Sequence, residues 1–380
     1  MDNTFCYQPW NGLEIYNNGR LRPCCKYRPE QDPLFEHINI EDDNAIERFQ
    51  NSAYIKNLRK QFLSGEKPEA CVRCWKDEEA GYPSQRQLHN QRWSKEFEQY
   101  DLKSNKLNLL NIPIGNLCNL KCRICGPHSS TKWIKEWQDI YSESFEKNEW
   151  ANNPKVWQTL IDHSDNLLEI HIHGGEPFLL DDDIHITFLE SLITNGVADR
   201  VRIHYSTNAT HFPTKSLQTI WKHFGHIDVQ PSIDDIGKRF EYNRKGANWS
   251  QVEENLLRYS TLVASNFQLS IACTVSIFTI NYLDEIFDYY SQNKLPMPWL
   301  GRLHNPDQYR CSVFPTVARC SLQQKLENSK WQDVRSVSNW LNDNHSHLLP
   351  KFKTITAMHD KYRNEKFEDV FPELVDMLEF

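Results

Sequence analysis

The sequence lacks any long hydrophobic run. No apolar stretch among its 380 residues approaches the ~20 residues that a membrane-spanning helix requires. The first ten residues, MDNTFCYQPW, contain neither the basic segment nor the apolar segment of a secretory signal. We therefore expect a cytoplasmic protein without a membrane partner, which excludes membrane-embedded functions.

An excess of positive charge is also absent. The chain has 43 Lys and Arg against 51 Asp and Glu, so its formal net charge is −8. Such a chain has no overall electric field that attracts a phosphate backbone, although a local basic patch can still exist. We therefore do not expect a nucleic acid partner. No repeat of fixed period and no low-complexity tract is present either.

Cysteine, in contrast, is abundant. A composition of 39% hydrophobic, 12% aromatic and 25% charged residues is typical of a soluble globular protein. The length suffices for one large domain and a smaller one. Because a reducing cytosol keeps ordinary thiols reduced, the eleven cysteines require an explanation other than disulfides. Eight of them precede residue 126, which makes metal or iron–sulfur ligation the leading hypothesis.

From Lys106 onward, apolar strands alternate with amphipathic helical segments. This pattern predicts an α/β fold with βαβ units around a parallel sheet, and six such units can curl into a partial barrel with its site at the C-terminal strand ends. The expected strands are Leu107–Ile114, Leu168–His173, Val201–Ser206, Ile227–Ser232, Gln268–Val275 and one between Pro298 and Val313. The expected helices are Asp183–Thr194, Ser216–His223, Gln251–Leu262 and Tyr282–Gln292.

Changes in composition and residue pattern along the sequence also predict domain boundaries. Residues 1–80 contain turn signals around short apolar runs, as expected of small hairpins and loops that fold around a metal or cluster. Residues 81–104 resemble a charged helical linker, and residues 105–315 contain the predicted barrel. Residues 316–380 are predicted to be a helical extension.

Three cysteines follow the first predicted strand of the barrel. Cys118, Cys122 and Cys125 have the spacing C-x3-C-x2-C. Three thiolates on one loop can bind three irons of a four-iron cluster and leave the fourth iron open to a small molecule. The motif and its place resemble the signature of radical S-adenosylmethionine (SAM) enzymes, although Ile124 stands where that family often has an aromatic residue. A zinc site is the alternative interpretation of the three cysteines alone.

A second motif follows the next predicted strand, where Gly174, Gly175, Glu176 and Pro177 form a GGEP turn. Two glycines let the backbone approach a ligand, and a carboxylate can accept hydrogen bonds from an ammonium group. The turn resembles the second signature of radical SAM enzymes. By that resemblance it orders the methionine part of SAM, with Glu176 near the amino group.

Two later strand ends extend the resemblance. Ser206-Thr-Asn208 is similar to a Thr-Asn strand end of the family, and Ser232-Ile-Asp234 is similar to its Ser-x-Asp turn. The resemblance implies that Ser206, Asn208 and Ser232 contact SAM. Arg244 occurs where related enzymes often have an arginine that pairs with the SAM carboxylate, and a solvated surface charge is its alternative role.

Two residues are candidates for contact with the substrate. Asp234 can point into the cavity on the same face as Ser232, although helix capping explains it equally well. Cys273, in the middle of a predicted strand, can donate a hydrogen atom to a substrate radical or can simply be a small buried hydrophobic residue. Cys311 and Cys320 are either free thiols or further ligands.

The N-terminal cysteines have a spacing of their own. Cys6, Gly19 and Cys24 reproduce the C-x(9–15)-G-x4-C opening of the auxiliary modules called SPASM and twitch, and Cys71 and Cys74 add a C-x2-C pair. By this resemblance the four thiolates hold one auxiliary [4Fe–4S] cluster, as in the shorter twitch form. Cys25 is an alternative to Cys24 as a ligand. A structural zinc site is the competing interpretation, and the module precedes the barrel, whereas in the family it usually follows it.

The resemblance implies an activity and its partners. A low-potential donor of the flavodoxin or ferredoxin type reduces the first [4Fe–4S] cluster, SAM is cleaved, and a 5′-deoxyadenosyl radical removes a hydrogen atom from the substrate. Enzymes with these auxiliary modules often modify peptides, so the expected substrate is a peptide or a peptidyl side chain, and the expected reaction is its oxidation, cross-linking or epimerisation. A small metabolite such as an amino acid, sugar or nucleoside is the second expectation. The third expectation is a non-catalytic binding protein whose fold is stabilised by iron–sulfur clusters or zinc.

Overall fold

The chain folds into two compact units that alternate along the sequence. The computed structural model describes residues 4–79, 81–98, 100–262 and 264–379. The first unit contains Met1–Asn116, Lys147–Tyr205 and Thr214–Ile227, and the second contains Leu117–Glu146, Ser206–Pro213 and Asp228–Phe380. The domain boundaries expected at residues 80, 104 and 315 stay predictions.

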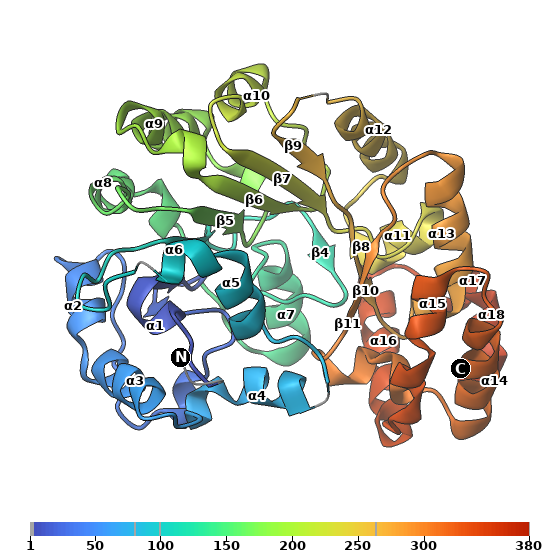
Figure 1. The fold of residues 1–380 in the computed structure, drawn as a ribbon. Helices are drawn as coiled ribbons and strands as arrows, with labels where there is room; N and C mark the ends of the chain where they lie inside the picture. The colour runs from blue at the N-terminus through green and yellow to red at the C-terminus, as the bar shows by residue number, and fades with distance from the viewer. Residues whose placement is uncertain (1–3, 80, 99, 263, 380) are drawn as a thin grey trace. The chain divides into compact units, whose positions relative to one another are not determined.

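The strands are short, and most of them belong to one sheet (Figure 1). Their bounds are β1 Gly12–Ile15, β2 Leu21–Arg22, β3 Leu109–Pro113, β4 Lys121–Cys122, β5 Glu169–His173, β6 Arg202–Thr207, β7 His226–Pro231, β8 Arg244–Lys245, β9 Phe267–Leu269, β10 Ala272–Val275 and β11 Trp299–Arg302. The seven-stranded sheet has the order β2-β1-β3-β5-β6-β7-β9, and β10-β11 and β4-β8 form separate pairs.

The helices precede, separate and follow these strands. Their bounds are α1 Gln8–Asn11, α2 Ala45–Asn51, α3 Ala53–Leu63, α4 Val72–Glu79, α5 Gln85–Arg92, α6 Ser94–Glu98, α7 Trp133–Tyr141, α8 Pro154–Asp162, α9 Asp182–Thr194, α10 Lys215–Trp221, α11 Gly237–Asn243, α12 Trp249–Ser260, α13 Leu283–Gln292, α14 Thr316–Glu327, α15 Gln332–Ser336, α16 Leu349–Arg363, α17 Phe367–Val370 and α18 Pro372–Leu378. No helix in the described part of the chain is long and apolar enough to cross a membrane.

The N-terminal hairpin joins the parallel sheet of the first unit. β1 pairs with β2 in antiparallel register, and Gly19 has φ 80° in the turn between them, which a residue with a Cβ rarely adopts. β1 also pairs in parallel with β3, with Leu13 opposite Leu110. The predicted hairpin is confirmed. Two helices that the sequence did not predict, α2 and α3, bury Phe49, Tyr54 and other apolar side chains beside it.

The strands β3, β5 and β6 are parallel, as the alternation of strands and helices predicts. Ile112 lies opposite Ile172, which lies opposite Tyr205 on the next strand, and all three side chains are fully buried. The intervening α9 begins where the Asp181 carboxylate accepts a hydrogen bond from the Asp183 N–H, and it packs against α8 and α10. The α/β class with a parallel sheet is therefore confirmed.

One predicted strand was wrong. The segment Gln268–Val275 forms two strands, β9 and β10, because its backbone changes partners in the middle. Ser270 N donates to Val229 O, whereas Ile271 O accepts from Trp299 N and begins the parallel pair of β10 with β11. The remaining predicted strands and helices agree with the structure to within about two residues.

The C-terminal residues are helical, as predicted. Figure 1 shows α14 to α18 gathered together, in orange to red. Their core is aromatic: Phe352, Phe367 and Phe371 are fully buried, and the rings of Phe367 and Phe371 stack with centroids 5.1 Å apart. These contacts form the apolar centre of the extension.

Candidate functional site

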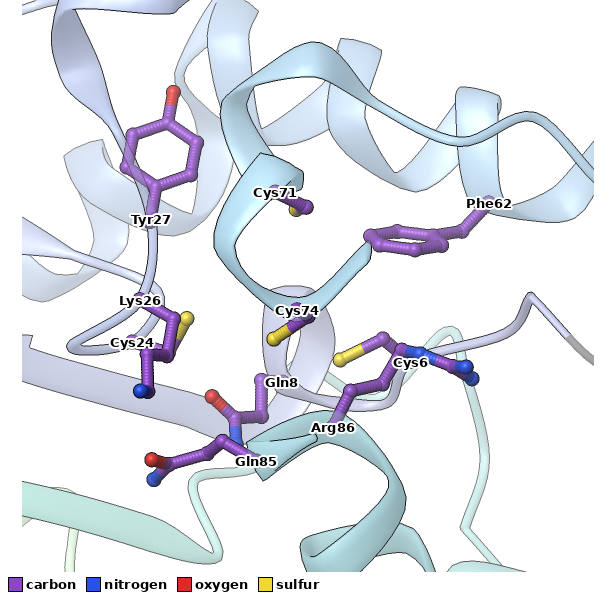
Figure 2. Close-up of a pocket in the computed structure, with 10 residues that line it drawn as sticks. All are labelled: Cys6, Gln8, Cys24, Lys26, Tyr27, Phe62, Cys71, Cys74, Gln85 and Arg86. Carbon is purple, nitrogen blue, oxygen red and sulfur yellow. The ribbon is translucent and has the colours of Figure 1, made fainter. Parts of the chain in front are cut away.

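Four cysteines of the first unit line one cavity. Cys6, Cys24, Cys71 and Cys74 are the four that the spacing predicts as ligands, and they come from the N-terminal loop, the segment after β2, and the start of α4. Figure 2 shows the sulfur atoms of Cys6, Cys24 and Cys74 directed toward the middle of this cavity. Folding thus brings together residues that are up to 68 positions apart in the sequence.

Cys24 and its neighbour Cys25 have different surroundings. Cys24 lines the cavity, whereas the Cys25 thiol lies 3.3 Å from the Gln85 side-chain oxygen, to which it donates a hydrogen bond. Adjacent residues direct their side chains differently, so only one of the two thiols lies at the cavity where the predicted ligand is needed. The geometry therefore favours Cys24.

Other side chains of the cavity were not expected from the sequence. Arg86 is buried, donates to the carbonyl of Phe5 at 2.8 Å, and pairs with Glu78 at 2.8 Å. Gln8 and Gln85 also line the cavity, and both contact His89. No local motif marks these residues, because they lie up to 81 positions from the groups that they contact.

The cavity favours protonated thiols until a metal binds. Burial raises the pKa of the Cys6 thiol to about 12, and the N–H of Gln8 opposes the shift. Burial likewise raises the pKa of Cys24, and the negative charge of Cys6 adds to the effect. Because thiolates are the metal-binding form, a cation must displace these protons when it binds.

The donor set fits an iron–sulfur cluster in number and kind. Across the described ranges of the chain, no group of three or more His, Cys, Asp or Glu side chains is placed to hold a metal ion. A zinc ion binds its four thiolates at about 2.3 Å from one centre. A four-iron cluster instead binds each thiolate at a different iron, so its ligands lie around a wider volume. The four cysteines around the cavity supply the four thiolates that such a cluster takes.

The three-cysteine loop belongs to the second unit. Cys118 and Cys122 are buried and pack with Leu120, and Cys125 lies against this group. Cys122 is in β4, which pairs with β8 so that Cys122 lies opposite Arg244. The Leu120 N–H lies 3.5 Å from the Cys118 sulfur. The fold therefore gathers the three predicted ligands into one place.

Two of the residues expected to bind SAM lie beside these thiols. The Asn208 amide nitrogen lies 3.8 Å from the Cys118 sulfur and donates to the Asn119 side chain at 2.9 Å. Arg244 Nη1 lies 3.9 Å from the Cys122 sulfur. Donors of this kind stabilise thiolates and raise the reduction potential of iron–sulfur clusters. Asn208 and Arg244 are therefore placed to support the cysteine loop.

Asp234 binds groups of the protein with both carboxylate oxygens. Oδ2 accepts from Arg244 Nε at 3.0 Å and Nη2 at 2.7 Å, and Oδ1 accepts from Thr274 N at 2.8 Å. The carbonyl of Asp234 is 3.8 Å from the sulfur of Cys273. Burial raises the pKa of Cys273 well above its usual range. These contacts suit a positioning role for Asp234 and a buried thiol at Cys273.

The GGEP turn belongs to the first unit. Gly174 has φ 69° and Gly175 has φ 52°. A Cβ on Gly174 would lie 2.5 Å from Pro113 Cβ and 2.7 Å from the Asn17 side-chain oxygen, so this position accepts only glycine. Glu176 is fully buried and accepts from Phe178 N at 3.2 Å, which caps the short 3-10 helix that starts at Pro177. A ligand at Glu176 would share the carboxylate with this cap.

Ser206 and Ser232 lie at the ends of neighbouring strands. Ser206 is half-buried in β6, and Ser232 is half-buried just beyond β7. Ser232 N donates to Thr207 O at 2.8 Å, which places the two strand ends side by side. Their predicted role in SAM binding stays a prediction.

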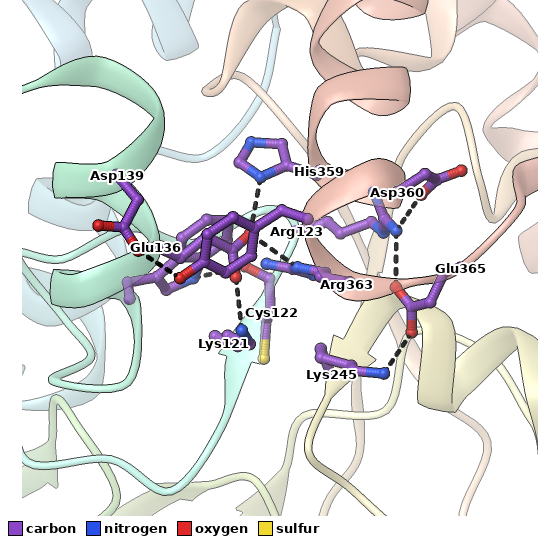
Figure 3. Close-up of polar contacts among 12 residues, drawn as sticks. Lys121, Cys122, Arg123, Glu136, Asp139, Lys245, His359, Asp360, Arg363 and Glu365 are labelled. Atoms are coloured by element: carbon purple, nitrogen blue, oxygen red, sulfur yellow. Dashed lines mark hydrogen bonds and ion pairs between the residues drawn. The ribbon is translucent and has the colours of Figure 1, made fainter.

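A network of ion pairs around the cysteine loop was not predicted (Figure 3). The Glu136 carboxylate accepts from Lys121 Nζ at 2.6 Å, from His359 Nδ1 at 2.8 Å and from Arg363 Nε at 2.8 Å. Arg123 follows Cys122 in the sequence, and it pairs with Asp360 and with Glu365. The residues flanking Cys122 are thus tied to α16, more than 220 positions later in the chain.

Part of the chain matches a known family. Residues 6–75 match the SPASM family, an iron–sulfur cluster-binding domain. This SPASM segment contains all four cysteines of the cavity. Because the family is described by its cluster, the match favours iron–sulfur over zinc in the SPASM segment.

The remaining comparisons are weaker. No curated protein matches the chain. Among solved structures, anSMEcpe with bound AdoMet is 19% identical with a TM-score of 0.39, and 51% of each chain is covered. SuiB of Streptococcus suis bound to S-adenosylmethionine is 16% identical with a TM-score of 0.37, covering 78% of this chain and 61% of that one. TYW1 with a lysine-pyruvate adduct is 12% identical with a TM-score of 0.33, covering 57% and 72%.

These three TM-scores are too low to carry an argument about this chain. The chain spans about half the length of the anSMEcpe structure that it matches. We therefore base the function proposed below on the SPASM match and on the geometry of the described residues.

Proposed function

We propose that the protein is a radical SAM enzyme with one auxiliary cluster in its SPASM segment. The observation that carries the proposal is that partly buried Cys125 packs against the buried Cys118 and Cys122, in a chain whose residues 6–75 match a cluster-binding family. When bound, a [4Fe–4S] cluster on the loop would supply an electron for reductive cleavage of SAM to methionine and a 5′-deoxyadenosyl radical.

The residues of the second unit prepare the loop for that cofactor. Three thiolates occupy three of the four irons and leave one for SAM. Arg244 is held by Asp234, and its cationic side chain lies beside the Cys122 sulfur, where it offsets the negative charge of the thiolate. Asn208 performs a similar role at Cys118 through its neutral amide. Ser206, Asn208, Ser232, Arg244 and the GGEP turn are the proposed SAM contacts.

The cavity of the SPASM segment is the proposed auxiliary site. Cys6, Cys24, Cys71 and Cys74 supply four thiolates, which leave no iron of a four-iron cluster open. A fully ligated cluster suits electron transfer rather than substrate binding. We propose that this site accepts an electron from the substrate, which would make the overall reaction an oxidation or a cross-link.

The proposed substrate is a peptide or a peptidyl side chain. The SPASM resemblance supports it, because enzymes with such modules often modify peptides, and the net charge of −8 does not favour a nucleic acid. We further propose a cytoplasmic enzyme that takes electrons from a donor of the flavodoxin or ferredoxin type. The proposed domains are residues 1–80 for the auxiliary module, 81–104 for the linker, 105–315 for the barrel and 316–380 for the extension.

Cofactor content and SAM cleavage test this proposal. Protein prepared anaerobically should contain about eight irons and a similar amount of sulfide, because each cluster contains four of each. Replacement of Cys118, Cys122 and Cys125 with alanine should reduce the iron to about four and abolish release of 5′-deoxyadenosine from reduced protein with SAM. The exposed Cys320 offers a matched control, since Cys320→Ala should change neither value. Unchanged cleavage in the triple variant would overturn the assignment.

A further inference from the structure

The second unit contains a pocket of about 410 Å³ with aromatic walls. This volume is in the range of small-ligand sites. Arg123 and Cys125 of the cysteine loop line the pocket, and its other lining residues come from α7, the segment 305–309 and α16. None of the sequence motifs predicts it, and the proposed SAM contacts do not line it.

The walls of the pocket are made of tilted and edge-on rings. Trp137 lies 4.5 Å from Tyr141 and 5.9 Å from Trp133, measured between ring centroids. His359 lies 5.1 Å from Trp133 on another side. Aromatic rings attract a further ring at centroid distances of 4.5–7 Å. The walls therefore favour an aromatic group as the occupant.

Two buried donors of the pocket have no partner within the described residues. Arg123 lines the pocket and is 2% exposed, and its Nη1 makes no hydrogen bond within the described residues. Tyr309 also lines the pocket, and its buried hydroxyl likewise makes no hydrogen bond within the described residues, whereas His359 bonds to Glu136 and to Tyr141. A buried donor without a partner is costly, so an acceptor on the ligand would be stabilised here.

The charges around this donor favour a neutral acceptor. The Arg123 guanidinium already pairs with Asp360 and Glu365, and Lys245 also pairs with Glu365. Two cations and two carboxylates leave this group neutral. At the exposed rim, Lys351 is paired with Asp307 at 2.6 Å. Lys121 and Arg363 share the single carboxylate of Glu136 nearby, so the surroundings keep some positive charge. Arg123 itself is already paired with two carboxylates, and a peptide carbonyl needs only a donor.

We propose that this pocket binds an aromatic side chain of a peptide, with a main-chain carbonyl of that peptide accepting a hydrogen bond from Arg123. The aromatic character of the site follows from its own residues, and the choice of a peptide rests on the proposed function. The site thus recognises an aromatic residue of the substrate next to the cysteine loop. A nucleobase with its phosphate is the alternative occupant.

Ligand-observed NMR tests the proposal on the cluster-loaded protein without reductant. The probes are Ac-Ala-Tyr-Ala-NH2 and Ac-Ala-Leu-Ala-NH2 at equal concentration. We expect saturation transfer to the tyrosine ring protons, and an affinity for the leucine peptide that is about fivefold lower, since ring contacts contribute about 1 kcal/mol. Equal binding of the two peptides, or no binding of either, would overturn the proposal.

Two variants on one helix provide the structural control. Ile355 lines the pocket and Thr354 is an exposed neighbour that does not. Ile355→Trp should fill the pocket and reduce tyrosine-peptide binding at least about tenfold, whereas Thr354→Trp should leave it within about twofold. Trp137→Leu removes a wall and should also weaken binding, so the test does not depend on one variant. If a folded Ile355→Trp and a folded Trp137→Leu both bind normally, the proposal fails.

Competition identifies the alternative occupants. Displacement of the tyrosine peptide by SAM or by AMP, in a manner sensitive to Ile355→Trp, would assign the pocket to a nucleotide and overturn the proposal. Release of 5′-deoxyadenosine without peptide is measured separately. Failure of that release would refute the proposed function and leave the binding result intact. Failure of peptide binding would refute the pocket proposal and leave the proposed function intact.

Discussion

Asp234 and Arg244 form a buried ion pair in which one carboxylate oxygen accepts from both Nε and Nη2, at 3.0 and 2.7 Å. The two side chains are 4% and 8% exposed. The sequence marked both residues as candidates for contact with substrate or SAM, and the fold pairs them with each other. Arg244 reaches from this pair toward the sulfur of Cys122.

Asp234→Asn should strongly destabilise the protein. The substitution leaves the buried guanidinium without its counter-ion, and breaking a buried pair in this way costs about 3–5 kcal/mol. Asp343→Asn is the matched control, because Asp343 pairs with Arg302 but is 54% exposed, and its loss should cost less than about 1 kcal/mol. Urea unfolding measures both free energies. Similar losses in the two variants would contradict the burial argument.

Gly174→Ala should be more destabilising than Gly196→Ala. Both glycines have φ 69°, so both alanines pay the cost of a left-handed backbone, about 1 kcal/mol. Only at Gly174 would the new Cβ collide with Pro113 and Asn17, whereas nothing lies within 4 Å of it at Gly196. The difference between the two thermal unfolding midpoints isolates the steric cost of the GGEP turn. Equal midpoints would show that the turn relaxes freely.

Cys24→Ser should lower the iron content of the SPASM segment, and Cys25→Ser should not. Cys24 lines the cavity, whereas the Cys25 thiol is directed to Gln85. Combining each change with the alanine triple variant of Cys118, Cys122 and Cys125 restricts the measurement to the auxiliary site. We expect about four irons with Cys25→Ser and markedly fewer with Cys24→Ser. The opposite order would assign Cys25 as the ligand.

Glu136→Gln should lower the free energy of unfolding of the protein in a pH-dependent manner. Burial alone would raise the pKa of Glu136, but hydrogen bonds from His359 and the charges of Arg363 and Lys121 lower it to about 2. A depressed pKa adds stability that is present above about pH 4.5 and disappears as the pH falls toward 2. The shift corresponds to about 3 kcal/mol. Urea unfolding of Glu136→Gln and of the unchanged protein should show a large difference in the free energy of unfolding at pH 7. This difference should shrink below pH 4.5.

Cys320 should react with iodoacetamide well before Cys311. Cys320 is exposed, whereas Cys311 is fully buried and burial raises its pKa to about 11. At pH 8 only about one in a thousand Cys311 thiols is then ionised, and the thiolate is the reactive form. Mass spectrometry of the loaded protein follows both sites, and unfolded protein should label both. Early labelling of Cys311 would contradict the buried thiol.

The sequence by itself determined the features that depend on neighbours along the chain. The cysteine spacings, the GGEP turn and the alternation of strands and helices are local patterns, and they predicted the α/β fold and the candidate ligands. The break between β9 and β10 escaped prediction because its cause is a change of partners, from Val229 to Trp299.

Only the tertiary structure decided which side chains meet. Arg123 and Asp360 are 237 positions apart, and nothing in either local sequence indicates their ion pair. The preference for Cys24 over Cys25 and the aromatic pocket beside Cys125 likewise depend on contacts between distant segments. The physical reason is that spacing along the chain governs hydrogen bonds within strands and helices, whereas burial and charge pairing follow from how those elements pack.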